Sequence, residues 1–440
     1  MKKPLRLIAA LLAFCVAAAT FPPVGLALEE DDLRSGGSTL NEMIEQANPG
    51  DTITLTDNVS SAAQNDQAPW VINKNITIDG QNHSINVRAT GILLGADVTF
   101  RNVQLDLTSA DCRNAIIANG YTLTLDSVTA TSFSANVFCG TLLPASHETY
   151  VTVPTPGDSH TVNILGNTNL QGRTTNSLGA ANIFAGSLAM GGLDGNHNGA
   201  DDNGAENTFP GDVTINIENS AGSAALGTVY AGGGQQRIPV GEQSGKVTIP
   251  DPDKYRVGGT VTITGAAIPT VSGAGSGATN VVYQGSGNQA TKTFGDISSL
   301  SVESGNLVLQ NGSSFQTQPS LSVSNGAFLN IKDLGNLSVS NFQGGGSLIL
   351  GQNQTLTIEN GVTGTTKIGI GSIFNNASQT LPLENHTYIK APQSQAGDFV
   401  LVPYGSNPNM TLVRDGSGSW TASSSSSGGD ENRVQNFSFD

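Results

Sequence analysis

A short acidic stretch carries the residue types and spacing that could bind a metal ion. Residues 194–203 read DGNHNGADDN and contain the pattern D-x-N-x-N-G. Side-chain oxygens at alternate positions can converge on one calcium ion, and the glycine permits the sharp turn of the first half of an EF-hand loop. The sequence therefore predicts a calcium site whose candidate ligands are Asp194, Asn196, Asn198, Asp202 and Glu206.

The second half of this loop departs from the EF-hand pattern. Ala205 occupies the twelfth position, where a bidentate acid is expected, and Glu206 follows one residue later. No flanking helices are indicated. The alternative is a solvated loop rich in Asn, Asp and Gly, in which case no cofactor is required.

Two cysteines outside the N-terminal segment could form a disulfide. Cys112 and Cys139 are 139 − 112 = 27 residues apart, which is close to the repeat length described below. They could therefore lie on neighbouring turns of a repeating chain, and an exported protein permits disulfides. The alternative is two buried thiols.

The N-terminal segment is typical of an exported protein. A basic start and an apolar run over residues 7–19 precede a small-x-small sequence that ends at Ala27. Because the run is too short for a membrane span, we expect a signal peptide over residues 1–27, a linker over 28–37, and a secreted or cell-surface protein. No later stretch is long enough for an integral membrane segment.

Composition favours a folded β protein that does not bind nucleic acid. Only 12% of residues are charged and 5% are aromatic, whereas 54 are glycine. The formal net charge of −16 becomes −16 − 3 = −19 once Lys2, Lys3 and Arg6 are removed with the signal peptide. An acidic chain repels nucleic acid and anionic lipid surfaces, and it disfavours anionic polymers unless cations bridge the contact.

Apolar-polar-apolar triplets recur along the chain and predict short strands. Residues 76–78 are followed by 98–100 after 98 − 76 = 22 residues and by 123–125 after 123 − 98 = 25 residues. Further triplets begin at Val162, Val213, Val261, Leu300, Leu321, Leu337 and Leu356. Gly, Asn and Asp follow most of them, as turns with positive φ require. A loose period of about 20 to 25 residues indicates a solenoid in which equivalent strands stack in parallel around one apolar column.

The predicted solenoid covers residues 38–413. A helix over residues 39–47 would cover its open end, because four apolar residues have helical spacing: Leu40, Met43, Ile44 and Ala47. Long insertions are expected to project from one face, near residues 140–160, 186–211 and 231–258. Residues 414–440 are expected to end a C-terminal cap and continue as a Ser/Gly-rich flexible tail.

Three segments near the N-terminus carry a family resemblance. They read ANPGDTITL (47–55), INKNITIDGQNHSI (72–85) and GILLGADVTFRNVQL (91–105). With the preceding helix they resemble the opening of right-handed parallel β-helix proteins, and more narrowly the pectate-lyase-like adhesive domains of bacterial surface proteins. The resemblance covers residues 38–130 and implies an all-β, right-handed parallel β-helix solenoid with a short N-terminal capping helix. Its motifs are strand and turn residues, so they specify fold better than function.

Catalysis in such a fold would need charged residues gathered in one groove. A lyase of this fold needs an Arg base beside acids that hold calcium, and a glycosidase needs paired carboxylates. Candidates recur beside the predicted strands, namely Arg88, Arg101, Arg113, Asp79, Asp97, Asp106, Asp111 and Asp126. Recurrent Asp after a strand is also what turns use. The chain has no polygalacturonase signature and no H-E-x-x-H motif, and its five histidines are scattered.

We therefore expect a non-catalytic, adhesin-like binding protein that recognises a glycan or an extracellular matrix component. The stiff solenoid would present the long insertions as contact surface. The alternative is a polysaccharide lyase or glycoside hydrolase of the pectate-lyase-like fold, which an Arg and two or three carboxylates in one groove would favour. A purely structural stalk is a third possibility.

Calcium is predicted to order the loop of residues 194–206 without stabilising the core of the solenoid. The carboxylates of the loop repel one another, and a bound ion would gather their oxygens at about 2.3–2.6 Å. Calcium should protect the loop from proteolysis while the main unfolding transition moves only slightly, and Asp194→Ala should abolish the protection. Cleavage near Asp201 that calcium does not change would identify a solvated loop, and global unfolding on chelation would place the metal elsewhere.

Overall fold

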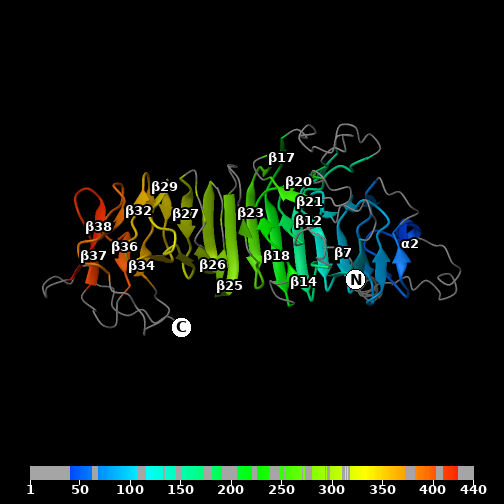
Figure 1. Cartoon of the computed structure of the whole chain (residues 1–440), viewed down its shortest axis with the longest axis horizontal. Helices are drawn as coiled ribbons and strands as arrows, with labels where there is room; N and C mark the ends of the chain where they lie inside the picture. The colour runs from blue at the N-terminus through cyan, green and yellow to red at the C-terminus, as the bar shows by residue number, and fades with distance from the viewer. Residues whose placement is uncertain are drawn as a thin grey trace, which may run out of the picture.

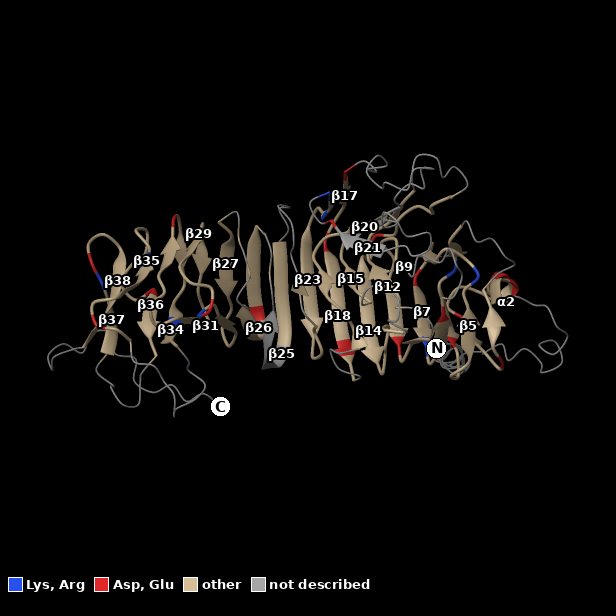
Figure 2. Cartoon of the chain, in the orientation of Figure 1, with Lys and Arg blue, Asp and Glu red and all other residues tan. Residues whose placement is uncertain are grey.

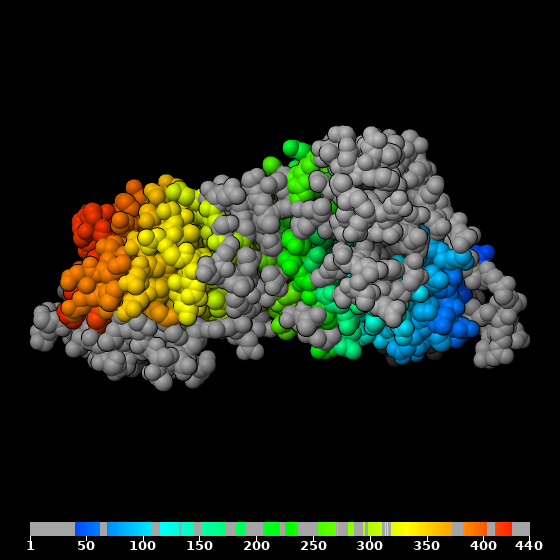
Figure 3. Space-filling view, in the orientation of Figure 1, coloured from blue at the N-terminus to red at the C-terminus, as the bar shows by residue number. Residues whose placement is uncertain are grey.

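The computed structural model describes residues 40–424 with gaps. The gaps are residues 62–67, 108–114, 132–133, 145–150, 173–180, 191–205, 221–224, 238–246, 252–253, 270, 273–279, 293, 295–297, 310–312, 314, 316–317, 372–381 and 403–409. The predicted signal peptide, the linker and most of the predicted tail lie outside the described residues. Figure 1 shows an elongated molecule in which the chain advances from blue strands at one end to red strands at the other. The same order of colours follows the long axis in the space-filling view (Figure 3).

The longest sheet, called sheet A here, extends along the whole molecule. Its strands, in hydrogen-bonded order, are β1 (Thr52–Thr54), β4 (Ile76–Asp79), β7 (Val98–Arg101), β10 (Leu123–Asp126), β14 (Thr161–Gly166), β18 (Val213–Asn219), β23 (Thr260–Gly265), β25 (Asn280–Lys292), β26 (Ser299–Leu309), β28 (Phe328–Asn330), β31 (Ser347–Leu350), β34 (Thr366–Ile370) and β36 (Phe399–Leu401). A side branch leaves β26 through β27 (Ser320–Val323), β30 (Phe342–Gln343) and β33 (Val362–Thr363).

Further sheets accompany sheet A in each half. Sheet B contains β2 (Val59–Ser60), β5 (Ser84–Asn86), β8 (Gln104–Asp106) and β11 (Thr129–Ala130). Sheet C contains β3 (Trp70–Ile72), β6 (Ile92–Leu94), β9 (Ala115–Ile117), β12 (Asn136–Phe138), β15 (Ile183–Phe184), β19 (Val229–Tyr230) and β24 (Val271–Ser272). From β1 to β12, successive strands join sheets A, B and C in turn, so every third strand returns to the same sheet.

The remaining strands form smaller sheets. Sheet F, in the C-terminal half, contains β29 (Leu337–Val339), β32 (Leu356–Ile358), β35 (Thr387–Lys390), β38 (Ser419–Ser424) and β37 (Met410–Arg414). The long insertions contribute sheet D, with β13 (Leu142–Leu143), β16 (Leu188–Met190), β20 (Gly234–Arg237) and β21 (Val247–Pro250). They also contribute sheet E, with β17 (Asn207–Phe209) and β22 (Tyr255–Val257).

The predicted triplets from residues 76–78 to residues 300–302 lie in strands of sheet A in matching register. Val98 is paired with Ile76 on one side and Leu123 on the other, and Phe100 is paired with Ile78 and Leu125. These residues are at most 2% exposed and belong to one continuous core. The prediction of an all-β fold built from parallel strands is confirmed. Parallel strands in long stacked sheets are consistent with a parallel β-helix-like fold.

One part of the predicted repeat is wrong. The triplets that begin at Leu321, Leu337 and Leu356 were expected to be equivalent strands on successive turns. Leu321 lies in β27 of the sheet A branch, whereas Leu337 and Leu356 are paired with each other in sheet F. The reason is that strands of different sheets all bury alternate residues, so an apolar-polar-apolar triplet does not reveal the sheet to which it belongs.

The predicted helix is present and covers the N-terminal end of the core. Helix α2 (Leu40–Gln46) buries Leu40, Met43 and Ile44 against the first strands. The ammonium group of Lys74 donates to the carbonyl of Ala47 at 2.7 Å and to that of Glu45, so it satisfies carbonyls at the C-terminal end of the helix. Within the described residues, no helix has the length and apolarity that a membrane crossing requires.

The C-terminal end is closed by antiparallel strands. Strand β38 pairs with β35 on one side and with β37 on the other, and both pairings are antiparallel. Trp420 on β38 is 2% exposed, and its indole N–H donates to Ser394 Oγ at 2.8 Å.

Three glycines mark the corner that follows sheet C, where adjacent backbone segments approach closely. The amide of Gly140 donates to the carbonyl of Gly186 at 3.1 Å, and the amide of Gly186 donates to the carbonyl of Gly232 at 3.0 Å. A Cβ atom on Gly186 would lie 2.4 Å from the backbone nitrogen of Gly233 and 2.8 Å from the carbonyl oxygen of Tyr255. Both neighbours are backbone atoms, which cannot rotate away, so this corner requires glycine.

Substitution of Gly186 by alanine should destabilise the protein. The added methyl group overpacks the corner, and we expect a loss of about 1–3 kcal/mol or more in the free energy of unfolding. Urea unfolding followed by circular dichroism would measure it. Gly416→Ala is the matched control, because a Cβ there meets nothing within 4 Å. Equal stability of the two variants would contradict the packing argument.

Candidate functional site

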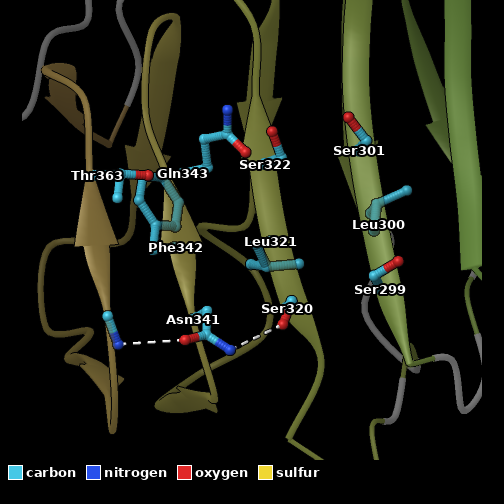
Figure 4. A pocket seen from close by; sticks show the side chains of 11 residues that line it. Ser299, Leu300, Ser301, Ser320, Leu321, Ser322, Asn341, Phe342, Gln343 and Thr363 are labelled. Atoms are coloured by element: carbon cyan, nitrogen blue, oxygen red, sulfur yellow. Dashed lines mark hydrogen bonds between the residues drawn. The ribbon is translucent and has the colours of Figure 1, made fainter.

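A polar groove lies on the sheet A branch in the C-terminal half. It has a volume of about 370 Å³ and is formed by strands β26, β27, β30 and β33. Its lining residues are Ser299, Leu300, Ser301, Ser320, Leu321, Ser322, Asn341, Phe342, Gln343, Gly361 and Thr363. Figure 4 shows their side chains on adjacent strands.

Strand alternation explains this lining. Leu300, Leu321 and Phe342 occupy what are called the floor positions here; they are at most 1% exposed, so their side chains point into the core beneath the groove. They are in register, because β26 pairs Leu300 with Leu321 and β27 pairs Leu321 with Phe342. The residues on either side of each floor position face outward, since successive side chains of a strand point to opposite faces. Two parallel rows of small polar side chains therefore flank the floor (Figure 4).

The first row, called the locked row here, consists of Ser299, Ser320, Asn341 and Gly361. Ser299 Oγ donates to Asn280 Oδ1 at 2.7 Å. Asn341 Nδ2 donates to Ser320 Oγ at 3.2 Å, and Asn341 Oδ1 accepts the amide of Gly361 at 3.2 Å. The Asn341 side chain thus links three neighbouring strands, and the side chains of the locked row hydrogen-bond within the sheet.

The second row, called the open row here, consists of Ser301, Ser322, Gln343 and Thr363. Register places Ser301 beside Ser322, Ser322 beside Gln343, and Gln343 beside Thr363. Gln343 and Thr363 are exposed. Within the described part of the chain, the four side chains make no hydrogen bond to other residues. Their hydroxyl and amide groups are therefore available to a ligand.

The groove offers hydrogen bonds but no charge. Its lining contains no Asp, Glu, His, Lys, Arg, Cys or Tyr. Figure 2 shows charged residues dispersed along the molecule, mostly near strand ends and turns. Hydroxyl and amide groups can donate to and accept from a neutral polyhydroxyl molecule. General acid–base chemistry needs titratable groups that this groove lacks.

The predicted calcium site falls almost wholly outside the described residues. This applies to Asp194, Asn196, Asn198 and Asp202. Glu206 is described, is exposed, and immediately precedes β17. Where side chains are described, no group of three or more His, Cys, Asp or Glu residues is arranged to hold a metal ion. The calcium loop stays a prediction.

The predicted disulfide is also untested, because Cys112 lies outside the described residues. Cys139 follows β12 and is fully buried in the core. Burial raises the pKa of the Cys139 thiol far above its ordinary value, since a thiolate would be desolvated there. A buried thiol of this kind is poorly reactive.

Asp79 and Arg101 form a close ion pair among the candidate catalytic residues. Arg101 Nη2 and Nε donate to Asp79 Oδ2 at 2.7 and 3.1 Å, and the amide of Gln81 donates to Asp79 Oδ1 at 3.3 Å. Burial by itself would raise the pKa of the Asp79 carboxyl. The hydrogen bonds from Arg101 and Gln81 and the positive charge of Arg101 outweigh it, so the pKa is lowered from 3.8.

This ion pair has the contacts of a structural element. The Asp79 side chain is 8% exposed, and its carboxylate is occupied by the turn that follows β4. Asp126 lies beside Arg101 on the next strand, but its Oδ1 accepts the hydroxyl of Ser127 at 3.1 Å. Asp97 Oδ1 accepts the amide of Thr122 at 2.7 Å. These carboxylates satisfy turns, as the alternative interpretation of the recurrent Asp residues expected.

Among the described residues, the charged candidates Arg88 and Asp106 do not line the groove. Arg88 is partly exposed after β5, and Asp106 ends β8 in sheet B. Asp111 and Arg113 lie outside the described residues. The groove lies on β26, β27, β30 and β33, many strands away from β4 and β7 in sheet A.

Two features were not predicted from the sequence: the groove, and an aromatic column on the outer face of sheet C. Phe138, Phe184 and Tyr230 are in register on successive strands, and adjacent rings are stacked with centroids 4.4 and 4.9 Å apart. A repeated pattern could have revealed this column: VFCGTL at 137–142, IFAGSL at 183–188 and VYAGGG at 229–234. The signal for the groove was weaker, because Ser and Gln in outward positions are ordinary for a solvated strand.

Loss of the Asp79 carboxylate should remove a pH-dependent part of stability. Because its pKa is lowered on folding, the ion pair stabilises the protein above the unfolded pKa, and the contribution is lost as pH falls through the folded pKa. Asp79→Asn should reduce the free energy of unfolding by about 1 kcal/mol at neutral pH and much less at about pH 2, which urea unfolding at both pH values would measure. Glu359→Gln, at an exposed site, is the control. An equal loss at both pH values would contradict the assignment.

Comparison of the chain with protein-family models, with curated proteins and with solved structures gives no match in any of the three.

Proposed function

We propose that this chain is a secreted or cell-surface binding protein that holds a neutral glycan in the polar groove and does not catalyse a reaction. The proposed scaffold is a right-handed parallel β-helix solenoid of the pectate-lyase-like adhesive type. Parallel pairing of strands about one turn apart and the covering helix α2 support it. We assign a right-handed solenoid because connections between parallel strands of one sheet are almost always right-handed.

The observation that carries the proposal is the open row beside the locked row. Asn341 fixes the spacing of the strands through its own hydrogen bonds, so the neighbouring hydroxyl and amide groups are held in place before a ligand arrives. Sugars present alternating hydroxyl groups and apolar C–H faces. The groove supplies donors and acceptors for the hydroxyl groups in the open row.

A neutral ligand fits the charges of the protein better than a charged one. The chain carries a net charge of −16, and the groove lining adds no cation that could attract an acidic polymer. An acidic glycan would therefore be repelled at long range. Binding of a neutral glycan should depend little on salt, since no ion pair forms.

The absence of titratable groups in the groove argues against the lyase or hydrolase alternative. A glycosidase needs two carboxylates at a defined separation, and a lyase needs a base. Asp79 and Arg101 come closest to such a set, yet they are bonded to each other and lie away from the groove. The alternative ligand, an extracellular matrix component, is tested by the same binding experiment.

The test is binding of the mature chain to an array of neutral glycans, acidic glycans and matrix proteins. Gln343→Ala and Ser322→Ala should each weaken neutral-glycan binding about fivefold, the ratio expected for one net hydrogen bond of about 1 kcal/mol. The affinity should change little with salt. Thr99→Ala, on an outward position of the same sheet, is the control that should leave binding intact.

Three outcomes would overturn the proposal. The first is that no glycan binds, and the second is that the groove variants bind as tightly as the native protein. The third is the release of reducing or unsaturated sugars from a polysaccharide by the native protein, which would establish catalysis.

A further inference from the structure

Three Asn-Gly pairs in the described part of the chain have different surroundings. They are residues 119–120 after β9, residues 325–326 between β27 and β28, and residues 360–361 between β32 and β33. In such a pair the backbone nitrogen of the glycine can attack the side-chain amide of the asparagine, because glycine has no side chain to block the approach. The reaction turns the amide into an acid, and its rate in a folded protein depends on how the pair is held.

The pair at residues 119–120 is protected by burial and by hydrogen bonds. Asn119 is fully buried, and its Nδ2 donates to the carbonyls of Leu94 and Pro154 at 3.0 and 3.2 Å. The amide of Gly120 donates to the carbonyl of Cys139 at 2.9 Å. Both the leaving group and the attacking nitrogen are therefore engaged in the interior, so this pair reacts only when the turn opens.

The pair at residues 360–361 is exposed, but its attacking nitrogen is engaged. Asn360 is exposed, and its amide donates to the carbonyl of Ser340 at 2.8 Å. The amide of Gly361 donates to Asn341 Oδ1 at 3.2 Å. The attacking nitrogen must lose its proton to form the new bond, so a hydrogen bond from this N–H opposes the reaction. Exposure alone does not make this pair reactive.

The pair at residues 325–326 is exposed and its attacking nitrogen is unengaged. The amide of Ala327 donates to the carbonyl of Ser324 at 3.0 Å, and Gly326 has a φ of 83°, so Asn325 and Gly326 are the central residues of a β-turn. Both are exposed. Among the described residues, the Gly326 amide has no hydrogen-bond acceptor. A Cβ atom on Gly326 would meet nothing within 4 Å, so the space beside the attacking nitrogen is open to water.

We infer that Asn325 is a site of spontaneous modification, at which the folded chain converts an asparagine into aspartate or isoaspartate. The Gly326 nitrogen loses its proton and bonds to Cγ of Asn325, the bond from Cγ to Nδ2 breaks, and ammonia leaves. The product is a five-membered succinimide ring, which water opens at either of its two carbonyls. One opening gives aspartate, and the other gives isoaspartate, in which the main chain passes through the former side chain. One water is consumed and one ammonia is released, with no change in oxidation state.

The modification changes the turn that follows a strand of the groove. Strand β27 carries Ser320, Leu321 and Ser322 of the groove lining and ends immediately before this turn. Either product places a new carboxylate in the turn, and isoaspartate also lengthens the main chain by one carbon. The turn is closely packed on one side, because a Cβ atom on Gly346 would collide with the carbonyl oxygen of Ser324. The site thus joins chemical ageing of the chain to the end of a groove strand.

The test is to incubate the folded protein in a mildly alkaline buffer and to follow conversion of amide to acid at the three asparagines by peptide mapping and mass spectrometry. We expect Asn325 to convert about fivefold faster than Asn360, the ratio that one net hydrogen bond on the attacking nitrogen provides. Asn119 should convert most slowly of the three, because it is also buried. In urea the three rates should become similar, since each pair is Asn-Gly.

A variant tests the role of the glycine amide directly. Asn341→Ala removes the acceptor of the Gly361 amide, so conversion of Asn360 should become about fivefold faster while that of Asn325 stays unchanged. Asn336→Ala is the matched control, because Asn336 Oδ1 accepts the amide of Thr355 and not that of Gly361. In the folded native protein, conversion of Asn119 or Asn360 as fast as that of Asn325 would overturn the inference. The same order of rates in urea, or an unchanged rate at Asn360 in Asn341→Ala, would also overturn it.

Discussion

The parallel register between equivalent strands is the constraint on which the rest of this structure depends. Each strand of sheet A pairs in parallel with the next strand of the sheet, so residues in equivalent positions are brought into lateral contact. Inward positions must then be apolar on every strand, as Ile78, Phe100 and Leu125 are. Outward positions are stacked by the same register, which turns scattered polar residues into continuous rows. The core and the candidate groove are therefore two faces of one pairing pattern.

The groove arises where this pattern changes. The long strand β26 pairs through its first half with β27 and through its second half with β28, so one sheet becomes two. Between the two halves, Gly305 has a φ of 72°, and Ser304 Oγ donates to the carbonyl of Gly285 at 2.9 Å. A left-handed residue at this position favours glycine. The outward rows of the branch run beside this division, and the hollow lined by Ser301, Ser322 and Gln343 lies there.

The sequence predicted the features that repeat and missed those that depend on distant pairing. Triplets such as 76–78 and 98–100 identify strands because burial imposes alternation locally. The helix at residues 40–46 was predictable for the same reason. Leu337 and Leu356 were assigned to the wrong sheet because strands of every sheet share the same apolar-polar-apolar pattern. The open row could not be recognised, because Ser322 and Gln343 become neighbours only through the pairing of β27 with β30. The candidate carboxylates were found, but their role depends on hydrogen bonds, such as that from Arg101 to Asp79, which spacing does not reveal.

The contrast between the locked and open rows explains how weakly bonding side chains could hold a ligand. One hydroxyl or amide contributes about 1 kcal/mol in water, which is too little for recognition on its own. Thr363 is β-branched and has few rotamers, and Asn341 links three neighbouring strands through its own hydrogen bonds. Less conformational entropy is lost on ordering the short Ser and Thr side chains than the longer Gln343, and contributions from successive strands can add. A longer neutral chain would contact more strands of the branch, so affinity would be set by the number of strands engaged rather than by one strong contact. Charged side chains are used differently: Asp79 and Arg101 neutralise each other within the scaffold, far from the groove, whose own lining contains no charged residue.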